Sequence, residues 1–206
     1  MTPTRHHILD LETLDLQPSA VILTIGIVTA EISDGGLEIT GRHYWRVQPF
    51  DQPGRTASED VLSWWRKQSA AALDEALDPS SNHREPLPQI LSAVSGTMDL
   101  YPYPIWGNGA DFDNAIMQHA FRQSGLQWPY YRNRCLRTAH QMAKSLVADF
   151  VTPERPAYLT PHIALDDAEY EALQLAHYMF AIDGNRPYPM NTLPRSGQQL
   201  DGVAVL

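Results

Sequence analysis

The spacing of apolar and polar residues over the first 50 positions is typical of β-strands. Residues 5–10 alternate in polarity, and residues 20–32 form a long run rich in Val, Ile and Thr, as in a well-buried strand. Residues 34–36, Asp-Gly-Gly, are a hairpin turn signal, after which residues 37–49 return as a third strand. The pattern therefore predicts three consecutive antiparallel strands.

The rest of the chain changes to helical spacing, with short strands between the helices. Helices are predicted over residues 58–68, 70–77, 89–100, 112–123, 138–147 and 164–181, and strands over residues 104–106 and 135–137. This order predicts an α/β fold in which a mixed β-sheet, with three antiparallel strands followed by parallel strands, is flanked by helices.

Length and composition indicate one ordinary globular domain. The chain has 206 residues, 43% of them hydrophobic. Cys135 is the only cysteine, which excludes an internal disulfide and argues against a cysteine-built zinc site. No apolar run approaches the roughly 18 residues of a membrane helix, and no signal-peptide core is evident, so we expect no membrane contact and a cytoplasmic location in a bacterial or phage-infected cell.

The last part of the chain differs from the rest. Residues 184–206 contain three prolines and little periodicity. We therefore expect residues 1–183 to form the domain, and residues 184–206 to be a C-terminal tail that wraps the surface, contacts a second copy in a homodimer, or is flexible.

Acidic residues stand out at the end of the first predicted strand. Asp10 and Glu12 are two positions apart, so on a strand both carboxylates point to the same face. A solvent-exposed strand end is the simpler interpretation of one such pair. The pair indicates a functional site only if other segments of the chain supply further acidic or histidine residues.

Two further places supply such partners. Asp111 and Asp113 lie where a strand passes into a helix, and His162 and Asp167 lie at the head of the last helix. Helix capping or a surface position would explain each place by itself. Together, however, four carboxylates converging on one site require cations, and oxygen ligands suit two Mg²⁺ or Mn²⁺ ions. Two such ions stabilise displacement at phosphorus, and a neutral histidine can accept a proton from the attacking water.

These residues resemble the motifs of the DnaQ-like 3′–5′ exonucleases of the DEDDh type, which have a ribonuclease H-like fold. The first motif, Asp-x-Glu-Thr, corresponds to residues 10–13, the second to Asn108 with residues 112–113, and the third, His-x-Ala-x-x-Asp, to residues 162–167. Within that family the strand at residues 21–26, the tryptophan pair and the WGNG turn are similar to phage exodeoxyribonuclease A and exodeoxyribonuclease VIII-like nucleases.

The resemblance implies a role for each motif residue. Asp10 would bridge two metal ions, Glu12 and Asp167 would bind the ion that carries the attacking water, and Asp113 rather than Asp111 would complete the ligand set. His162 would be the general base. The resemblance also implies that Leu11, Thr13 and Asn108 contact the substrate.

Other residues could contact nucleic acid. Trp64 and Trp65 are adjacent on a predicted helix, so one ring can pack in the core while the other stacks on a base; Trp65 is the residue we assign to the substrate. Arg132, Arg134 and Arg137 are the densest basic run in a chain of net charge −9, and they are candidates for phosphate contacts.

The sequence therefore predicts a metal-dependent 3′–5′ exonuclease that releases nucleoside 5′-monophosphates, with single-stranded DNA as the first choice of substrate. An exoribonuclease acting on RNA overhangs or short oligonucleotides is the alternative within the same chemistry. A non-catalytic nucleic-acid-binding module on the same fold is the alternative from another class. The complete set of five acidic and histidine residues argues against the latter.

Overall fold

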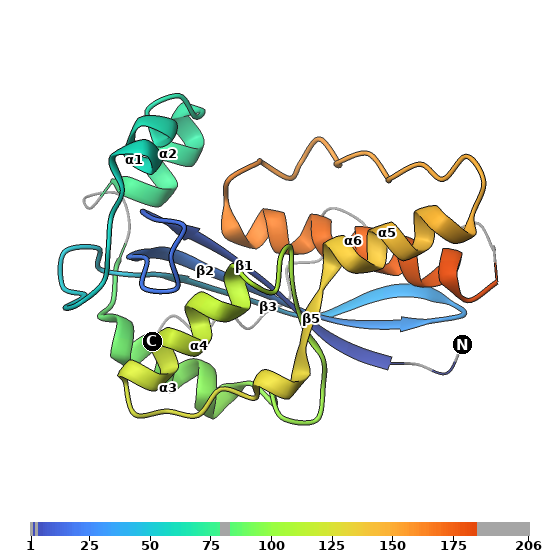
Figure 1. Cartoon of the computed structure of the whole chain (residues 1–206), viewed down its shortest axis with the longest axis horizontal. Coiled ribbons are helices and arrows are strands. Elements are labelled where there is room, and N and C mark those ends of the chain that lie inside the picture. The colour runs from blue at the N-terminus through green and yellow to red at the C-terminus, as the bar shows by residue number, and fades with distance from the viewer. Residues whose placement is uncertain (1, 3, 79–82, 185–206) are drawn as a thin grey trace.

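A five-stranded mixed sheet forms the centre of the molecule (Figure 1). The computed structural model describes residues 2, 4–78 and 83–184. The strand order is β3-β2-β1-β4-β5, with β1 antiparallel to β2 and β2 to β3, and with β1, β4 and β5 mutually parallel. The strands are β1 (Thr4–Thr13), β2 (Ile22–Ser33), β3 (Gly36–Arg46), β4 (Ile105–Gly107) and β5 (Asn133–Cys135).

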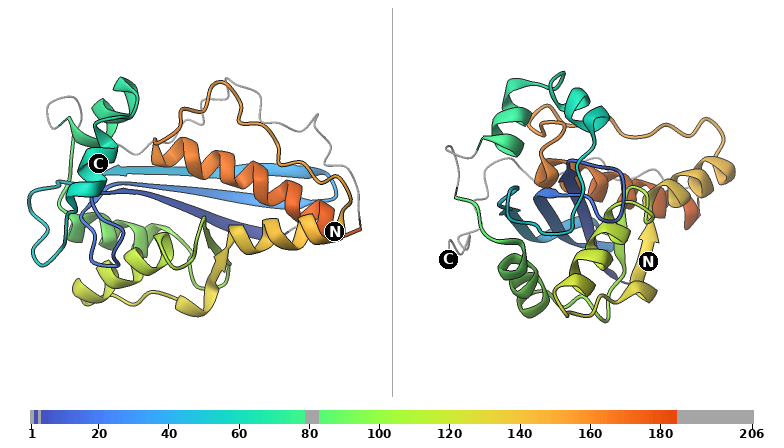
Figure 2. Two further views of the ribbon diagram at one scale, coloured as in Figure 1. Left: turned by 45° about the horizontal axis from the view of Figure 1, so that its top comes forward. Right: turned by 60° about the vertical axis from the view of Figure 1, so that its left-hand side comes forward.

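Helices cover both faces of this sheet (Figure 2). Helices α5 and α6 lie on one face, α3 and α4 lie on the other, and α1 and α2 pack beside the end of β2. The helices are α1 (Glu59–Trp65), α2 (Ala70–Leu77), α3 (Leu87–Thr97), α4 (Asp113–Gln123), α5 (Leu136–Leu146) and α6 (Ala164–Ile182), with a 3₁₀ turn at Tyr130–Arg132.

Alternate side chains of β1 pack into two separate hydrophobic cores. Ile8 packs against α5 and α6, whereas Leu9 packs against α3 and α4. Because β1 is covered on both faces, the adjacent His6 and His7 are both buried, although an alternating strand with one exposed face would leave one of them in solvent. The indole Nε1 of Trp106 donates to His6 Nδ1, and the ring nitrogens of His7 lie within hydrogen-bond distance of the Thr29 hydroxyl and the Asp99 carbonyl.

The predicted fold class is confirmed, and the differences concern element boundaries. The last strand lies at Asn133–Cys135 rather than at 135–137, and α5 therefore begins at Leu136 rather than at 138. Strand β1 continues through the acidic motif to Thr13, three residues beyond the predicted end. Residues 185–206 lie outside the described part of the chain, so the division into a domain and a tail stays a prediction.

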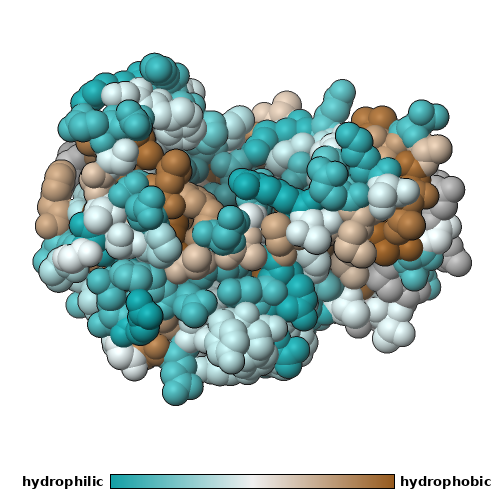
Figure 3. Space-filling view, in the orientation of Figure 1, coloured by the Kyte–Doolittle hydropathy of each residue, from teal (hydrophilic) through white to brown (hydrophobic). Residues whose placement is uncertain are grey.

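The surface is mixed, with an apolar area at the α5–α6 end of the molecule (Figure 3). Met142, Leu146 and Val151, from α5 and the segment after it, are exposed there. None of the helices in the described ranges is both long enough and apolar enough to span a bilayer. A homodimer and a cytoplasmic location stay predictions.

Candidate active site

The two acids of the first motif lie on the α6 face of β1. Asp10 and Glu12 share this face with Ile8, while Leu9 and Leu11 point into the opposite core. Glu12 is buried and Asp10 half-buried. Strand β1 therefore presents two carboxylates directly to the N-terminal half of α6.

A glycine in β2 allows α6 to approach that closely. Gly26 is the register partner of Asp10, and a Cβ at residue 26 would lie 2.3 Å from the carbonyl oxygen of Ala164, the first residue of α6. Real Cβ atoms do not come so near a backbone oxygen, so any side chain there would push the helix away. Gly26 therefore fixes the distance between the acids of β1 and the residues at the start of α6.

The third motif is held together by its own backbone. The His162 amide donates to Asp167 Oδ2 at 2.8 Å, and His162 adopts a positive φ of 65°, a conformation in which histidine is found more often than most residues. One ligand atom from each of Glu12, His162 and Asp167 lies within 4.8 Å of the others, a spacing compatible with a bound metal ion. Asp167 also forms an ion pair with Arg155, whose guanidinium lies over the Tyr170 ring.

Asp113 enters from the other side of β1. It is the first residue of α4, where the positive end of the helix dipole faces the carboxylate, and its Oδ1 accepts from the Leu11 amide at 3.2 Å. Gly107 makes room for it, because a Cβ at residue 107 would lie 3.1 Å from the Asp113 side chain. Burial raises the pKa of Asp113 to about 7, although amide hydrogen bonds from Leu11 and Asn108 and the charge of Arg137 act in the opposite direction.

The charges in this site are poorly balanced by the protein itself. Burial raises the pKa of Asp10 and of Glu12 well above the usual range, and the neighbouring carboxylates raise both further. Arg155 is a cation of the described chain that contacts the set directly, through Asp167. A set of oxygen donors that repel one another in the absence of added positive charge fits divalent cations such as Mg²⁺ or Mn²⁺.

Two residues near the site were missed by sequence reasoning. Glu171 lies in α6, four residues after Asp167 and therefore on the same helix face. Burial raises its pKa well above the usual range, with further increases from Asp113 and Asp167. An acid amid the alanines and leucines of that face was the available signal. Arg155 had none, because it lies in an irregular segment between α5 and α6.

The tryptophan pair divides its roles between core and site. Trp65 is 1% exposed and its indole nitrogen donates to the Thr13 carbonyl at 2.9 Å, which anchors α1 to the end of β1. Trp64 is 41% exposed and packs edge-on against the His162 ring, with centroids 4.8 Å apart. The assignment of Trp65 to the substrate stays a prediction, but burial favours Trp64 as the base-stacking residue.

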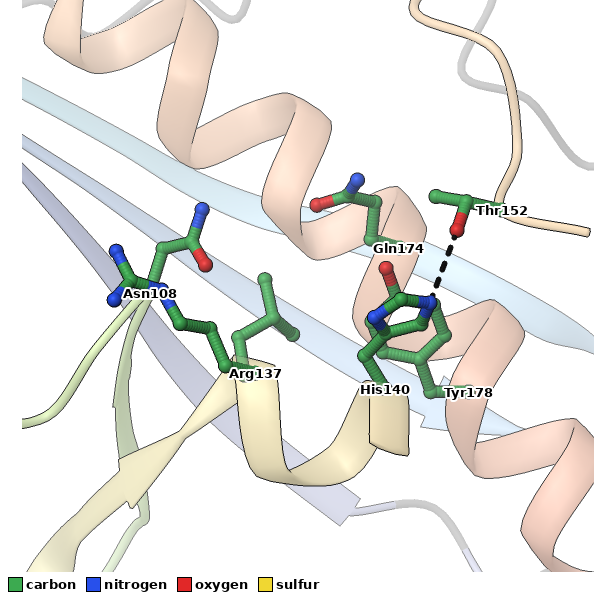
Figure 4. A pocket seen from close by; sticks show the side chains of 7 residues that line it. Asn108, Arg137, His140, Thr152, Gln174 and Tyr178 are labelled. Atoms are coloured by element: carbon green, nitrogen blue, oxygen red, sulfur yellow. Dashed lines mark hydrogen bonds between the residues drawn. The ribbon is translucent and has the colours of Figure 1, made fainter. Parts of the chain in front are cut away.

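The remaining predicted substrate residues lie around the acids. The side chain of Leu11 is buried, and the Thr13 hydroxyl donates to the Asp15 carbonyl at 2.8 Å. Asn108, whose amide hydrogen-bonds Asp113, also lines a cavity of about 170 Å³ (Figure 4). This cavity is lined by Asn108, Leu136, Arg137, His140, Thr152, Gln174 and Tyr178. Its side chains are mostly polar, and Thr152 hydrogen-bonds His140 across it at 3.3 Å.

A family model covers nearly all of this structure. The model for the Rv2179c-like 3′–5′ exoribonuclease domain matches residues 5–179, which include every element from β1 to most of α6. The chain belongs to this family. The family description names a 3′–5′ exoribonuclease domain, and the assignment of the acids and the histidine described above as a DEDDh set stays a prediction.

Solved structures share the fold of this chain. E. coli Exonuclease I in complex with a dA16 oligonucleotide superimposes with a TM-score of 0.63 at 14% identity, over 87% of this chain and 42% of that one. The nuclease domain of 3′hExo, a DEDDh family member bound to rAMP, gives 0.54 at 17% identity, over 90% and 96%. The Rv2179c-like chain therefore spans less than half of Exonuclease I.

Among curated proteins, none matches this sequence well enough to count as a relative. The narrower similarity to exodeoxyribonuclease A and exodeoxyribonuclease VIII-like nucleases stays a prediction. The family model confirms the broader expectation of a 3′–5′ exonuclease family, and the solved structures confirm the expected fold.

Proposed function

We propose that this chain is a two-metal 3′–5′ exonuclease that shortens single-stranded RNA and releases nucleoside 5′-monophosphates. The observation that carries the proposal is the group formed by Glu12, His162 and Asp167, whose ligand atoms lie within 4.8 Å, beside the acids Asp10 and Asp113. A group of this kind can hold divalent cations next to the phosphodiester bond that is hydrolysed.

The residues divide the work as follows. Asp10 would contact both ions, Glu12 and Asp167 would hold the ion near His162, and Asp113 would complete the set on the leaving-group side. When bound, the ions lower the pKa of an attacking water and balance charge at the phosphate. His162 accepts a proton from this water as its oxygen bonds to phosphorus. The bond to the 3′-oxygen of the preceding nucleotide breaks, and that oxygen takes a proton from solvent.

His162 is well placed for proton transfer. Its amide is fixed by Asp167, and its ring packs against Trp64, so both its backbone and its ring are oriented. The base of the 3′-terminal nucleotide would stack on the exposed part of Trp64. This stacking would bring the scissile phosphate next to the His162 ring.

The preceding nucleotide would lie toward the cavity beyond Asn108. Arg137 supplies a cation there, and His140, Thr152 and Gln174 supply hydrogen-bonding groups, which suit a phosphate and a ribose (Figure 4). The acidic net charge of the chain is consistent with a short contact of this kind rather than a long basic groove.

RNA is proposed as substrate because the family model describes an exoribonuclease domain. DNA, the first expectation from the sequence, stays the second candidate, since Exonuclease I of the same fold was solved with a dA16 oligonucleotide.

The test uses 5′-labelled RNA and DNA oligonucleotides of one sequence with purified protein and Mg²⁺ or Mn²⁺. We expect a ladder that shortens from the 3′ end, faster on RNA, and lost on addition of EDTA. Cleavage that persists in EDTA would contradict the metal mechanism, and faster hydrolysis of DNA would replace the RNA proposal with the DNA one.

A further inference from the structure

Glu171 is a buried acid whose position has no structural explanation. Its side chain is 4% exposed, and its Oε2 has no hydrogen-bond partner among the residues that the structure describes. A carboxylate oxygen that is removed from water and left unpaired is strongly destabilising. We therefore expect this oxygen to have a partner that the described part of the chain does not supply.

Glu171 lies near Asp10, at one side of the candidate metal site. Among the charged groups that raise the pKa of Asp10, Glu171 has the largest effect after burial itself. Asp113 and Asp167 act on Glu171 in turn, and the Asn108 side chain hydrogen-bonds its carboxyl. Side chains on a helix lean toward its N-terminus, so Glu171 leans back toward the turn that carries Asp167.

The geometry favours contact through water rather than direct coordination. Over the described residues, the tight group of ligand atoms consists of Glu12, His162 and Asp167, and Glu171 lies outside it. Mg²⁺ keeps several waters and uses only one or two protein carboxylates directly. An acceptor beyond the direct ligands can therefore hold the ion through one of its bound waters.

We propose that Glu171 is a fifth carboxylate of the metal centre, a positioning residue that accepts hydrogen bonds from the waters of a divalent ion held at Asp10. This proposal rests on the proposed metal-dependent function. It assigns to this chain an acid outside the DEDDh set, and it gives the second ion a tighter site than Asp10 alone would provide.

The test measures Mn²⁺ binding directly. Isothermal titration calorimetry with Mn²⁺ compares the metal-free full-length wild type with Glu171→Gln and with the control Glu169→Gln. Glu169 is a suitable control because it is a buried carboxylate of the same helix that already has a cation partner. Outer ligands typically change metal affinity by about 10–100-fold, so we expect Glu171→Gln to weaken the second Mn²⁺ by this factor. Glu169→Gln should leave both Mn²⁺ affinities unchanged.

Thermal melting without metal gives a second readout. Because Glu171→Gln removes an unpaired buried charge, the metal-free variant should melt higher than wild type, and Mn²⁺ should raise its melting temperature less. Glu171→Met provides the same test if the glutamine variant fails to fold. An unchanged Mn²⁺ affinity in both variants overturns the role of Glu171. Wild-type activity with no bound ion overturns the proposed function instead.

Discussion

Helix α6 carries two buried glutamates, two residues apart, in opposite environments. Glu169 is 6% exposed, and its two carboxylate oxygens accept from the Arg42 guanidinium at 2.6 and 3.0 Å. Glu171 is 4% exposed and faces other acids. Two positions turn a helix by about 200°, which places the first residue toward β3 and the second toward β1.

The difference separates acids that hold the fold together from acids that are prepared for a ligand. Glu169 and Arg42 join α6 to β3 and need nothing further. Glu171, Asp10 and Asp113 are buried carboxyl groups that repel one another when ionised, and the proposed cations would offset that repulsion. Four measurements can break or sharpen this distinction.

The largest effect is expected at Asp113. Asp113→Asn keeps the shape of the side chain but removes a ligand charge, and loss of several kcal/mol of transition-state stabilisation corresponds to about a 10³-fold or larger fall in kcat. Steady-state hydrolysis of a labelled oligonucleotide measures it. The control is Asp111→Asn, two residues earlier and exposed, which should retain wild-type activity. A fall of less than tenfold for Asp113→Asn would remove this residue from the catalytic set.

A substitution of Arg42 tests how much the ion pair of Glu169 stabilises the fold. Arg42→Met leaves Glu169 buried without a cation, which should lower the free energy of unfolding by about 3 kcal/mol. Urea denaturation measures this change, and the folded fraction should keep its kcat. Arg5→Met, which breaks the more exposed pair with Glu31, should change stability far less. Equal effects of the two variants would show that burial does not distinguish the pairs.

The pH dependence of the free energy of unfolding tests the buried carboxyl groups of the candidate active site. Because the folded pKa of Asp113 is about 7 and its unfolded value is near 3.8, the folded state holds the extra proton between these values, and stability falls as pH rises through 7. From pH 6.5 to 8 the metal-free protein should lose about 1 kcal/mol through this group alone.

The window begins at pH 6.5 because buried histidines act in the opposite direction below it. Burial lowers the pKa of His6 to about 4, so its contribution to stability increases with pH only up to about 6.5. Urea denaturation at several pH values in EDTA measures the slope, and Asp113→Asn should flatten it. A stability that rises from pH 6.5 to 8 in EDTA would contradict the raised carboxylate pKa values.

The smallest effect is expected at Arg137. Arg137→Ala removes the proposed charged phosphate contact at an exposed position, so KM for a short oligonucleotide should rise about fivefold, or roughly 1 kcal/mol. The slope of log KM against log salt should become shallower by about 0.7. Arg134→Ala is the control, because Arg134 binds the Tyr131 and Asn133 carbonyls and does not line the cavity. Equal effects of both variants would indicate a diffuse electrostatic contribution.

Much of the fold was accessible from the sequence because its signals are local. The Val- and Ile-rich run of β2, the turn before β3 and the periodicity of α6 each depend on neighbouring residues. The short strands were placed less well, because three residues of β5 carry little periodic signal and derive their register from β4.

The motif residues were predictable for the same reason, whereas their environment was not. Asp10, Glu12 and Asp113 were found by spacing and resemblance. Glu171 and Gly26 become meaningful only when β1, β2 and α6 are brought together, and no short-range pattern reports that contact. The choice between Trp64 and Trp65 likewise depended on how α1 meets the end of β1.

The close approach at Gly26 also has a consequence for motion. Because α6 touches the backbone of β2 there, Asp10, Glu12 and Asp167 belong to one stiff block of sheet and helix. His162, Arg155 and Trp64 come instead from the irregular segment before α6 and from the short α1. We therefore expect the spacing of Asp10, Glu12 and Asp167 to change less on substrate binding than the positions of Arg155 and Trp64.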